Sequence, residues 1–296
     1  PAPLPGIEFR SLFVPAALCA GDGKVFVLDQ GDTCLARLNP ATGRCDTTGG
    51  GEWNNRITDL TTYWRVREYG LLGGDTISTF TDTTMAFVRG VAADDRGRVY
   101  VAGSAIILIP DQQDPRIRTR TFQFRVYRYL RVAPGSVPRD PFMPGTDRWI
   151  RDPNFIVEEG SGIGTLSDPR GLYWAGAGVP GGPALFAADF GKNWVQKLSD
   201  ALPSTGLYRI DADSSSALDG PADVTADLAG YVYVADTGNQ RVLRYDPSGN
   251  FVQRVDVEPD TDGLPLLDPV AVAADDSLVY VADRAAGKVV RYQRRK

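Results

Sequence analysis

One acidic side chain, Asp223, stands where chemistry could take place. Five similar segments of the chain each begin with a run of small residues, and the position of Asp223 is held elsewhere by Ala17, Gly90, Gly171 and Ala271. A carboxylate at such a place could bind a cation or a substrate hydroxyl. It could equally be a solvated side chain in a channel. Because no second ligand can be named for it, Asp223 is only a weak candidate for a metal site.

Four other aspartates share one position of the same segments. Each ends a short hydrophobic run, where its side chain can accept hydrogen bonds from the amides of the following turn. Carboxylates at equivalent places of separate units cannot converge on one ion, so we expect a structural role for Asp29, Asp189, Asp236 and Asp283. The stretches 211–215 and 256–263 resemble fragments of calcium loops, but they lack the Gly and Glu of an EF-hand loop. We therefore expect no cofactor, with calcium as the alternative.

The chain contains no histidine. This excludes Ser-His-Asp and Cys-His catalysis, imidazole ligation of zinc or haem, and the commonest general base. The net charge of −5 disfavours bulk attraction to nucleic acid or anionic lipid. No run of about 18 apolar residues could span a membrane. With no recognisable catalytic constellation, we expect a protein that is not an enzyme.

The most unusual run covers residues 116–132, where six arginines alternate with apolar and aromatic residues. This composition is typical of single-stranded nucleic-acid platforms, of protein interfaces and of ordinary solvated strands. Because the chain is acidic, we favour a solvated strand or a surface for a protein or glycan partner over nucleic acid. The candidate surface residues, with two tryptophans added, are Arg116, Arg118, Arg120, Arg125, Arg128, Trp53 and Trp64.

The three cysteines indicate in which cellular compartment the protein is found. Cys34 and Cys45 flank the turn 39–43, so a hairpin would bring them together, and we expect a disulfide in an oxidising compartment. The alternative is a pair of reduced core cysteines. Cys19 lies among small residues and is expected to be a buried thiol. The chain opens without a charged and apolar leader, so it is either cytoplasmic or already processed. Because a disulfide is expected, we favour an exported protein whose signal peptide has been removed.

The elements that must position these residues recur along the chain. Small-residue strands are expected at 15–20, 89–94, 169–174, 221–227 and 269–275. Hydrophobic second strands follow at 24–29, 98–103, 184–189, 231–236 and 278–283. The ends of the second strands lie 74, 86, 47 and 47 residues apart, and a repeat of that size indicates units that bury their faces against neighbours.

Residues 221–250 hold one complete unit, with a small-residue strand, a turn at Ala229-Gly230, two further strands and a turn at 246–250. This order resembles the NHL repeat, a blade of β-propellers. The resemblance implies a single all-β propeller domain over 1–296. A degenerate blade within 124–159 would give six blades, which we expect; otherwise there are five blades with long insertions. The last copy lacks an outer strand, which residues 7–13 could supply to close the ring.

The resemblance leaves the ligand open. Our leading hypothesis is a non-catalytic binding or assembly module that contacts a protein or glycan partner through its loops and insertions. One alternative is a hydrolase, because six-bladed propellers include calcium-dependent lactonases, and Asp223 is then the one ligand that can be named. Another is an RNA-binding NHL domain, whose affinity would fall steeply with salt.

Overall fold

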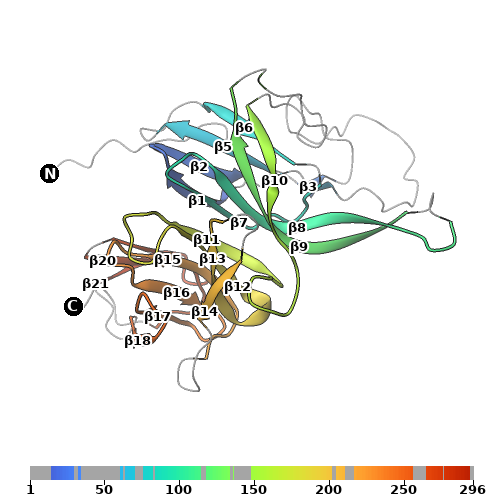
Figure 1. Cartoon of the computed structure of the whole chain (residues 1–296). Coiled ribbons are helices and arrows are strands. Elements are labelled where there is room, and N and C mark those ends of the chain that lie inside the picture. Colours follow the sequence, from blue (N-terminus) through green and yellow to red (C-terminus); the bar gives the residue numbers. More distant parts are fainter. Residues whose placement is uncertain are drawn as a thin grey trace.

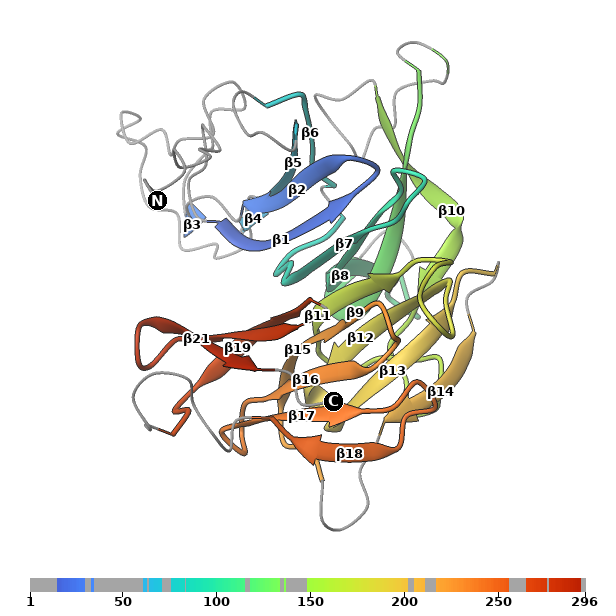
Figure 2. The same cartoon turned by 90° about the vertical axis from the view of Figure 1, so that its left-hand side faces the viewer.

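The computed structural model describes residues 15–29, 33–34, 61–62, 64–70, 76–82, 84–114, 118–133, 136, 148–201, 205–210, 217–255, 265–275 and 277–293. This part of the chain forms an all-β propeller of five blades around a common axis (Figures 1 and 2). Each blade is an antiparallel sheet whose strands follow one another in chain order from the axis outward. No helix in the described ranges is long and apolar enough to cross a membrane.

The strands of blades 1 and 2 are the least regular. Blade 1 consists of β1 (Pro15–Gly21), β2 (Lys24–Asp29), β5 (Arg65–Gly70) and β6 (Ser78–Phe80). Blade 2 consists of β7 (Gly90–Ala93), β8 (Val99–Pro110), β9 (Arg118–Arg131) and β10 (Trp149–Val157). A separate short pair, β3 (Thr33–Cys34) and β4 (Thr61–Thr62), lies between β2 and β5 in the chain.

The other three blades follow the repeat closely. Blade 3 consists of β11 (Pro169–Ala175), β12 (Ala184–Asp189), β13 (Trp194–Ser199) and β14 (Gly206–Ile210), with a short 3₁₀ turn at Phe190–Lys192. Blade 4 consists of β15 (Pro221–Ala226), β16 (Val232–Asp236), β17 (Arg241–Tyr245) and β18 (Phe251–Arg254). Blade 5 has three described strands, β19 (Pro269–Ala274), β20 (Leu278–Asp283) and β21 (Lys288–Gln293). All five expected inner and second strands are thus confirmed.

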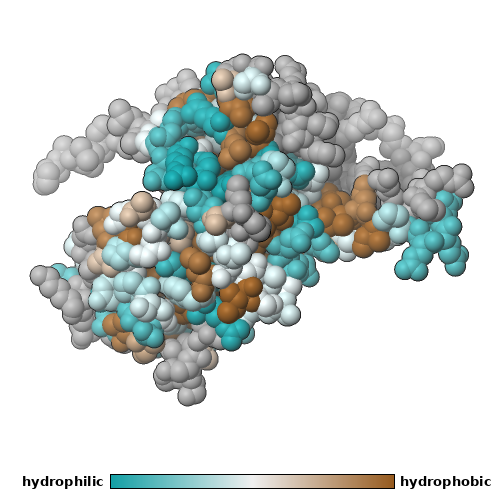
Figure 3. All heavy atoms as spheres, in the orientation of Figure 1, coloured by the Kyte–Doolittle hydropathy of each residue, from teal (hydrophilic) through white to brown (hydrophobic). Residues whose placement is uncertain are grey.

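The expectation of six blades is wrong, and the five-bladed alternative is confirmed. The segment 124–159 contains the outer half of blade 2 and no blade of its own. The reason is the length of β8 and β9, which have 12 and 14 residues and pair from Val99–Tyr129 out to Pro110–Arg118. This hairpin extends past the edges of β7 and β10 and projects from the disc (Figure 1). Exposed apolar residues follow it outward (Figure 3), among them Leu108, Ile109 and Phe122.

The closure expected from residues 7–13 lies outside the described residues. In the part of blade 5 that the structure describes, β21 is the outermost strand.

The inner strands pack directly against one another in the order β1, β7, β11, β15 and β19. Their small residues are required by this close approach. A Cβ added to Gly21 on β1 would lie 2.9 Å from the Cβ of Ala93 on β7, and one added to Gly90 on β7 would lie 3.2 Å from the carbonyl carbon of Arg170 on β11. Outside this ring the blades bury apolar layers between them, such as Tyr100 and Phe155 of blade 2 against Leu172 of blade 3.

The aspartates that end the second strands are structural, as expected, and all are fully buried. Their main partners differ from the expectation, because they lie chiefly in the loop before the inner strand of the same blade. Asp189 accepts from the amide of Asp168 at 2.8 Å, and Asp236 accepts from that of Asp219 at 2.7 Å. Asp283 accepts from the amide of Leu267 at 2.7 Å. Each carboxylate thereby fixes the point at which the chain enters the ring.

Replacement of Asp236 with Ala should lower the free energy of unfolding by about 3 kcal/mol, because it removes the acceptor of the Asp219 amide and of the Arg241 Nε from a fully buried position. The measurement is urea unfolding followed by circular dichroism. The exposed Asp95→Ala serves as the control and should change the free energy by less than about 0.5 kcal/mol. Equal effects of the two substitutions would contradict a structural role for this aspartate.

Candidate functional site

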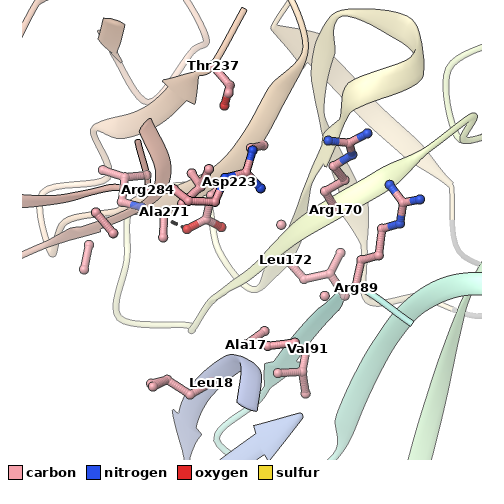
Figure 4. A pocket seen from close by; sticks show the side chains of 18 of the residues that line it. Ala17, Leu18, Arg89, Val91, Arg170, Leu172, Asp223, Thr237, Ala271 and Arg284 are labelled. Carbon is pink, nitrogen blue, oxygen red and sulfur yellow. Dashed lines mark hydrogen bonds between the residues drawn. The ribbon is translucent and has the colours of Figure 1, made fainter. Parts of the chain in front are cut away.

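The inner strands of all five blades line a central cavity of about 700 Å³ (Figure 4). The lining residues come from the starts and middles of the inner strands and from the turns after β16 and β20. Only one carboxylate, Asp223, is among the described lining residues, together with the three guanidinium groups of Arg89, Arg170 and Arg284. The cavity is therefore a cationic site with a single acid in its wall.

Asp223 reaches the cavity because β15 enters its sheet irregularly. The register of β15 against β16 shifts between Pro221 and Asp223. The half-buried carboxylate faces the cavity, where its Oδ2 accepts a hydrogen bond of 2.9 Å from the amide of Val272 on β19 (Figure 4). Burial raises the pKa of Asp223 to about 7, and the hydrogen bonds from Val272 and Val224 only partly oppose this rise. Near neutral pH the group can both accept and donate a proton.

Gly171 provides the space that Asp223 occupies. A Cβ added to Gly171 would lie 2.5 Å from the Cα of Asp223 and closer still to its carboxylate. The two residues hold equivalent positions on adjacent inner strands, β11 and β15. The Asp223 side chain of blade 4 thus occupies space that is free because Gly171 of blade 3 has no side chain.

Two of the arginines are held by one aspartate. Arg89, just before β7, donates from Nη1 to Oδ2 of Asp168 at 3.2 Å. Arg170 donates to the same oxygen from Nη2 at 3.0 Å and from Nε at 3.2 Å, and its guanidinium lies 3.2 Å from the ring centre of Phe190. Both guanidinium groups lie at one end of the cavity (Figure 4). Because one carboxylate serves two cations, this end can bind a further anion.

Arg284 completes the cationic end from blade 5. It lies in the turn after β20, and its Nε donates to Oδ2 of Asp268 at 2.7 Å. Its side chain is largely exposed. Arg284 is therefore free to reorient towards a ligand more readily than Arg170.

The sequence reasoning identified Asp223 and missed these arginines. A signal was present, because Arg precedes the small residue of the inner strand in two segments, as Arg89-Gly90 and Arg170-Gly171. Side chains at this position point to the cavity only because the ring brings the strand starts together (Figure 4).

The expected partner surface is corrected where the structure describes it. Trp64 is 1% exposed, and its Nε1 donates to the carbonyl of Met85 at 3.0 Å. Arg128 is 2% exposed and pairs with Asp152 at 2.6 Å and Asp200 at 3.1 Å. Both residues therefore pack the interior and do not form a surface.

The remaining members of that set are only partly described. Arg125 is half-buried and pairs with Glu158 at 2.9 Å. Arg118 and Arg120 lie on β9, but their side chains, like all of Trp53 and Arg116, fall outside the described residues.

The expected disulfide also falls outside the description. The backbone of Cys34 pairs with Thr61 in the β3–β4 pair, whereas Cys45 and the side chain of Cys34 are not described. Cys19 is a free thiol, and burial raises its pKa far above the ordinary value.

The described residues do not fit a calcium site in the cavity. Calcium takes six to eight oxygen ligands, commonly from several carboxylates. No group of three acidic, histidine or cysteine residues that could hold a metal occurs in the described ranges. Asp223 stands alone there, facing three arginines that would repel a cation. We therefore derive no step that depends on calcium.

Comparisons with known proteins agree with the architecture. No family profile matches the chain, and no curated protein does. Among solved structures, a protein of unknown function from Bacteroides caccae is 10% identical, with a TM-score of 0.52 over 94% of this chain and 80% of its own. A protein from Bacteroides uniformis, provisionally described as a 6-phosphogluconolactonase, is 14% identical, with a TM-score of 0.51 over 98% and 84%. At these identities the likeness establishes the fold alone.

A third structure, a gluconolactonase from Xanthomonas campestris, is 10% identical, with a TM-score of 0.47 over 91% of this chain and 68% of its own. Membership of the NHL family is not established. The expectation of a non-catalytic module, and of a protein that is not an enzyme, is wrong, because the Bacteroides uniformis protein of this fold, provisionally described as a lactonase, favours the enzymatic alternative.

Replacement of Gly171 with Ala should displace Asp223 and lower the free energy of unfolding by about 1–3 kcal/mol, because the added Cβ meets backbone that cannot move aside. Thermal and urea unfolding measure the loss. Gly178→Ala is the matched control, since an added Cβ there meets nothing within 4 Å. A neutral Gly171→Ala would show that the two inner strands are less closely packed than described.

Proposed function

We propose that the protein is a hydrolase of a lactone or ester, with its active site in the central cavity and Asp223 as the general base. The observation that supports this most directly is a carboxyl group with a pKa of about 7 in a cavity whose lining also includes three arginines. A general base is most effective when its pKa lies near the working pH. The provisional lactonase among the structures of this fold supports the same reaction class.

The reaction follows from the placement of these groups. The Asp223 carboxylate removes a proton from a water molecule as the water oxygen attacks the carbonyl carbon of the substrate. The charge that develops on the carbonyl oxygen is stabilised by a guanidinium group of the cationic end. As the bond to the leaving oxygen breaks, Asp223 returns the proton to that oxygen. The products are a carboxylic acid, which keeps the second proton of the water and then loses it to solvent, and a hydroxyl group. Both groups remain in one molecule when the substrate is a lactone.

The arginines also give the cavity a preference for anions. Arg89 and Arg170 share Asp168, so the cationic end keeps an excess of positive charge. A carboxylate or phosphate on the substrate would pair with it in bidentate fashion. The hydroxy acid released from a lactone would be held by the same groups.

Replacement of Asp223 with Asn should lower kcat/KM by at least about 100-fold, because the amide cannot accept the proton of the attacking water. In the unchanged protein, activity should rise with pH through about 7 as Asp223 ionises. The free energy of unfolding should fall as the pH rises from about 4, where Asp223 ionises in the unfolded chain, to about 7, where it ionises in the folded protein, and should level off above that. Asp223→Asn should lack this fall. The assay is hydrolysis of a panel of γ- and δ-lactones and aryl esters, followed by pH-stat titration.

Asp95→Asn, an exposed aspartate on the β7–β8 turn, is the matched control and should leave the rate unchanged. Full activity of Asp223→Asn would remove Asp223 from the mechanism. Loss of activity on chelation, with restoration by calcium, would replace this mechanism with a metal-dependent one.

We keep export and a Cys34–Cys45 disulfide as a proposal. Thiol titration of the unfolded protein, purified without reductant, should then find one free thiol, that of Cys19. Three free thiols would contradict the disulfide and with it the main argument for an oxidising compartment.

A further inference from the structure

The two ends of the central cavity differ in chemistry. The polar end is formed where the inner strands begin and by the turns after β16 and β20, and it holds Arg89, Arg170, Asp223, Thr237 and Arg284. The other end, towards β1, β20 and β21, contains aliphatic side chains and the aromatic ring of Tyr280. In Figure 4, Ala17, Leu18 and Val91 lie at this end, away from the guanidinium groups of Arg89 and Arg170.

The apolar end opens between blades 1 and 5. Leu18 on β1 is 70% exposed, although it lies in the middle of an inner strand, and Val289 on β21 is 69% exposed. Tyr280 on β20 is also exposed, and all three residues line the cavity. We refer to Leu18, Tyr280 and Val289 as the apolar trough.

The apolar trough is poorly suited to a substrate with many hydroxyl groups. Each buried hydroxyl of a sugar lactone needs a hydrogen-bonding partner. Among the described lining residues, the uncharged side chains that could provide one are Thr237 and Tyr280. The hydroxyl of Thr237 already donates to the carbonyl of Pro269 at 2.6 Å. A hydrocarbon chain, by contrast, would gain by covering Leu18 and Val289.

We infer that the cavity takes an amphiphile, a lactone or ester whose reacting carbonyl lies at the polar end and whose hydrocarbon chain lies along the apolar trough. This inference rests on the proposed function for the reaction, but the binding of the chain can be measured without turnover. Binding should tighten about fourfold for each methylene group that becomes buried, until the trough is filled.

The test uses the straight-chain carboxylates from butanoate to decanoate as probes that cannot be hydrolysed. Isothermal titration calorimetry of the whole protein should show a dissociation constant that falls with chain length, by about fourfold for each methylene. Leu18→Asp and Val289→Asp should abolish this dependence on chain length. Leu228→Asp is the control, because Leu228 is 67% exposed in the β15–β16 turn and does not line the cavity.

The outcomes separate this inference from the proposed function. Dependence on chain length that Leu18→Asp abolishes and Leu228→Asp preserves supports the inference, whether or not any ester is hydrolysed. Binding that does not vary with chain length overturns it, even if Asp223-dependent hydrolysis of short lactones is found. An equal loss in Leu18→Asp and Leu228→Asp also overturns it, because the chain would then bind outside the trough.

Discussion

The close approach of the inner strands is the constraint on which the rest of this molecule depends. Five strands meet around one axis, and at several positions an added Cβ would collide with the backbone of the next blade. Small residues are therefore obligatory along most of the ring. Where two inner strands approach most closely, a larger side chain is accommodated beside a glycine, as Asp223 is placed beside Gly171. Asp223 is thus an exception to the small residues of the inner strands, and the glycine at the equivalent position of the adjacent strand makes room for it.

Buried carboxylates hold the loops from which the inner strands start, and these loops carry residues that line the cavity. Asp189, Asp236 and Asp283 end their second strands and bind the amides of the loops that lead into the ring. The loop held by Asp189 contains Asp168, which in turn holds Arg89 and Arg170 at the cavity. A chain of contacts therefore runs from a structural aspartate to the guanidinium groups of the site. The lone acid of the cavity, by contrast, has only amide partners, and its pKa rises accordingly.

The repeat at 221–250 allowed all five inner and second strands to be located from the sequence, because alternation and turn residues act locally. The blade count was wrong because the extra length after residue 103 forms a long hairpin rather than a further blade, and strand length is set by pairing across the sheet. Arginines at 116–131 resembled a binding surface, yet Arg128 is buried because Asp152 and Asp200 from other segments neutralise it.

The sequence by itself determined the all-β class, the repeat, the structural aspartates and the unusual place of Asp223, since each is visible as a residue type at a repeat position. Only the tertiary structure decided that Asp223 shares a cavity with Arg89, Arg170 and Arg284, and that its far end is apolar. These residues lie up to 195 positions apart, from 89 to 284. Their chemistry depends on the arrangement of the five inner strands around one cavity. Neither a distance across that cavity nor a change of pKa within it is encoded in any local pattern.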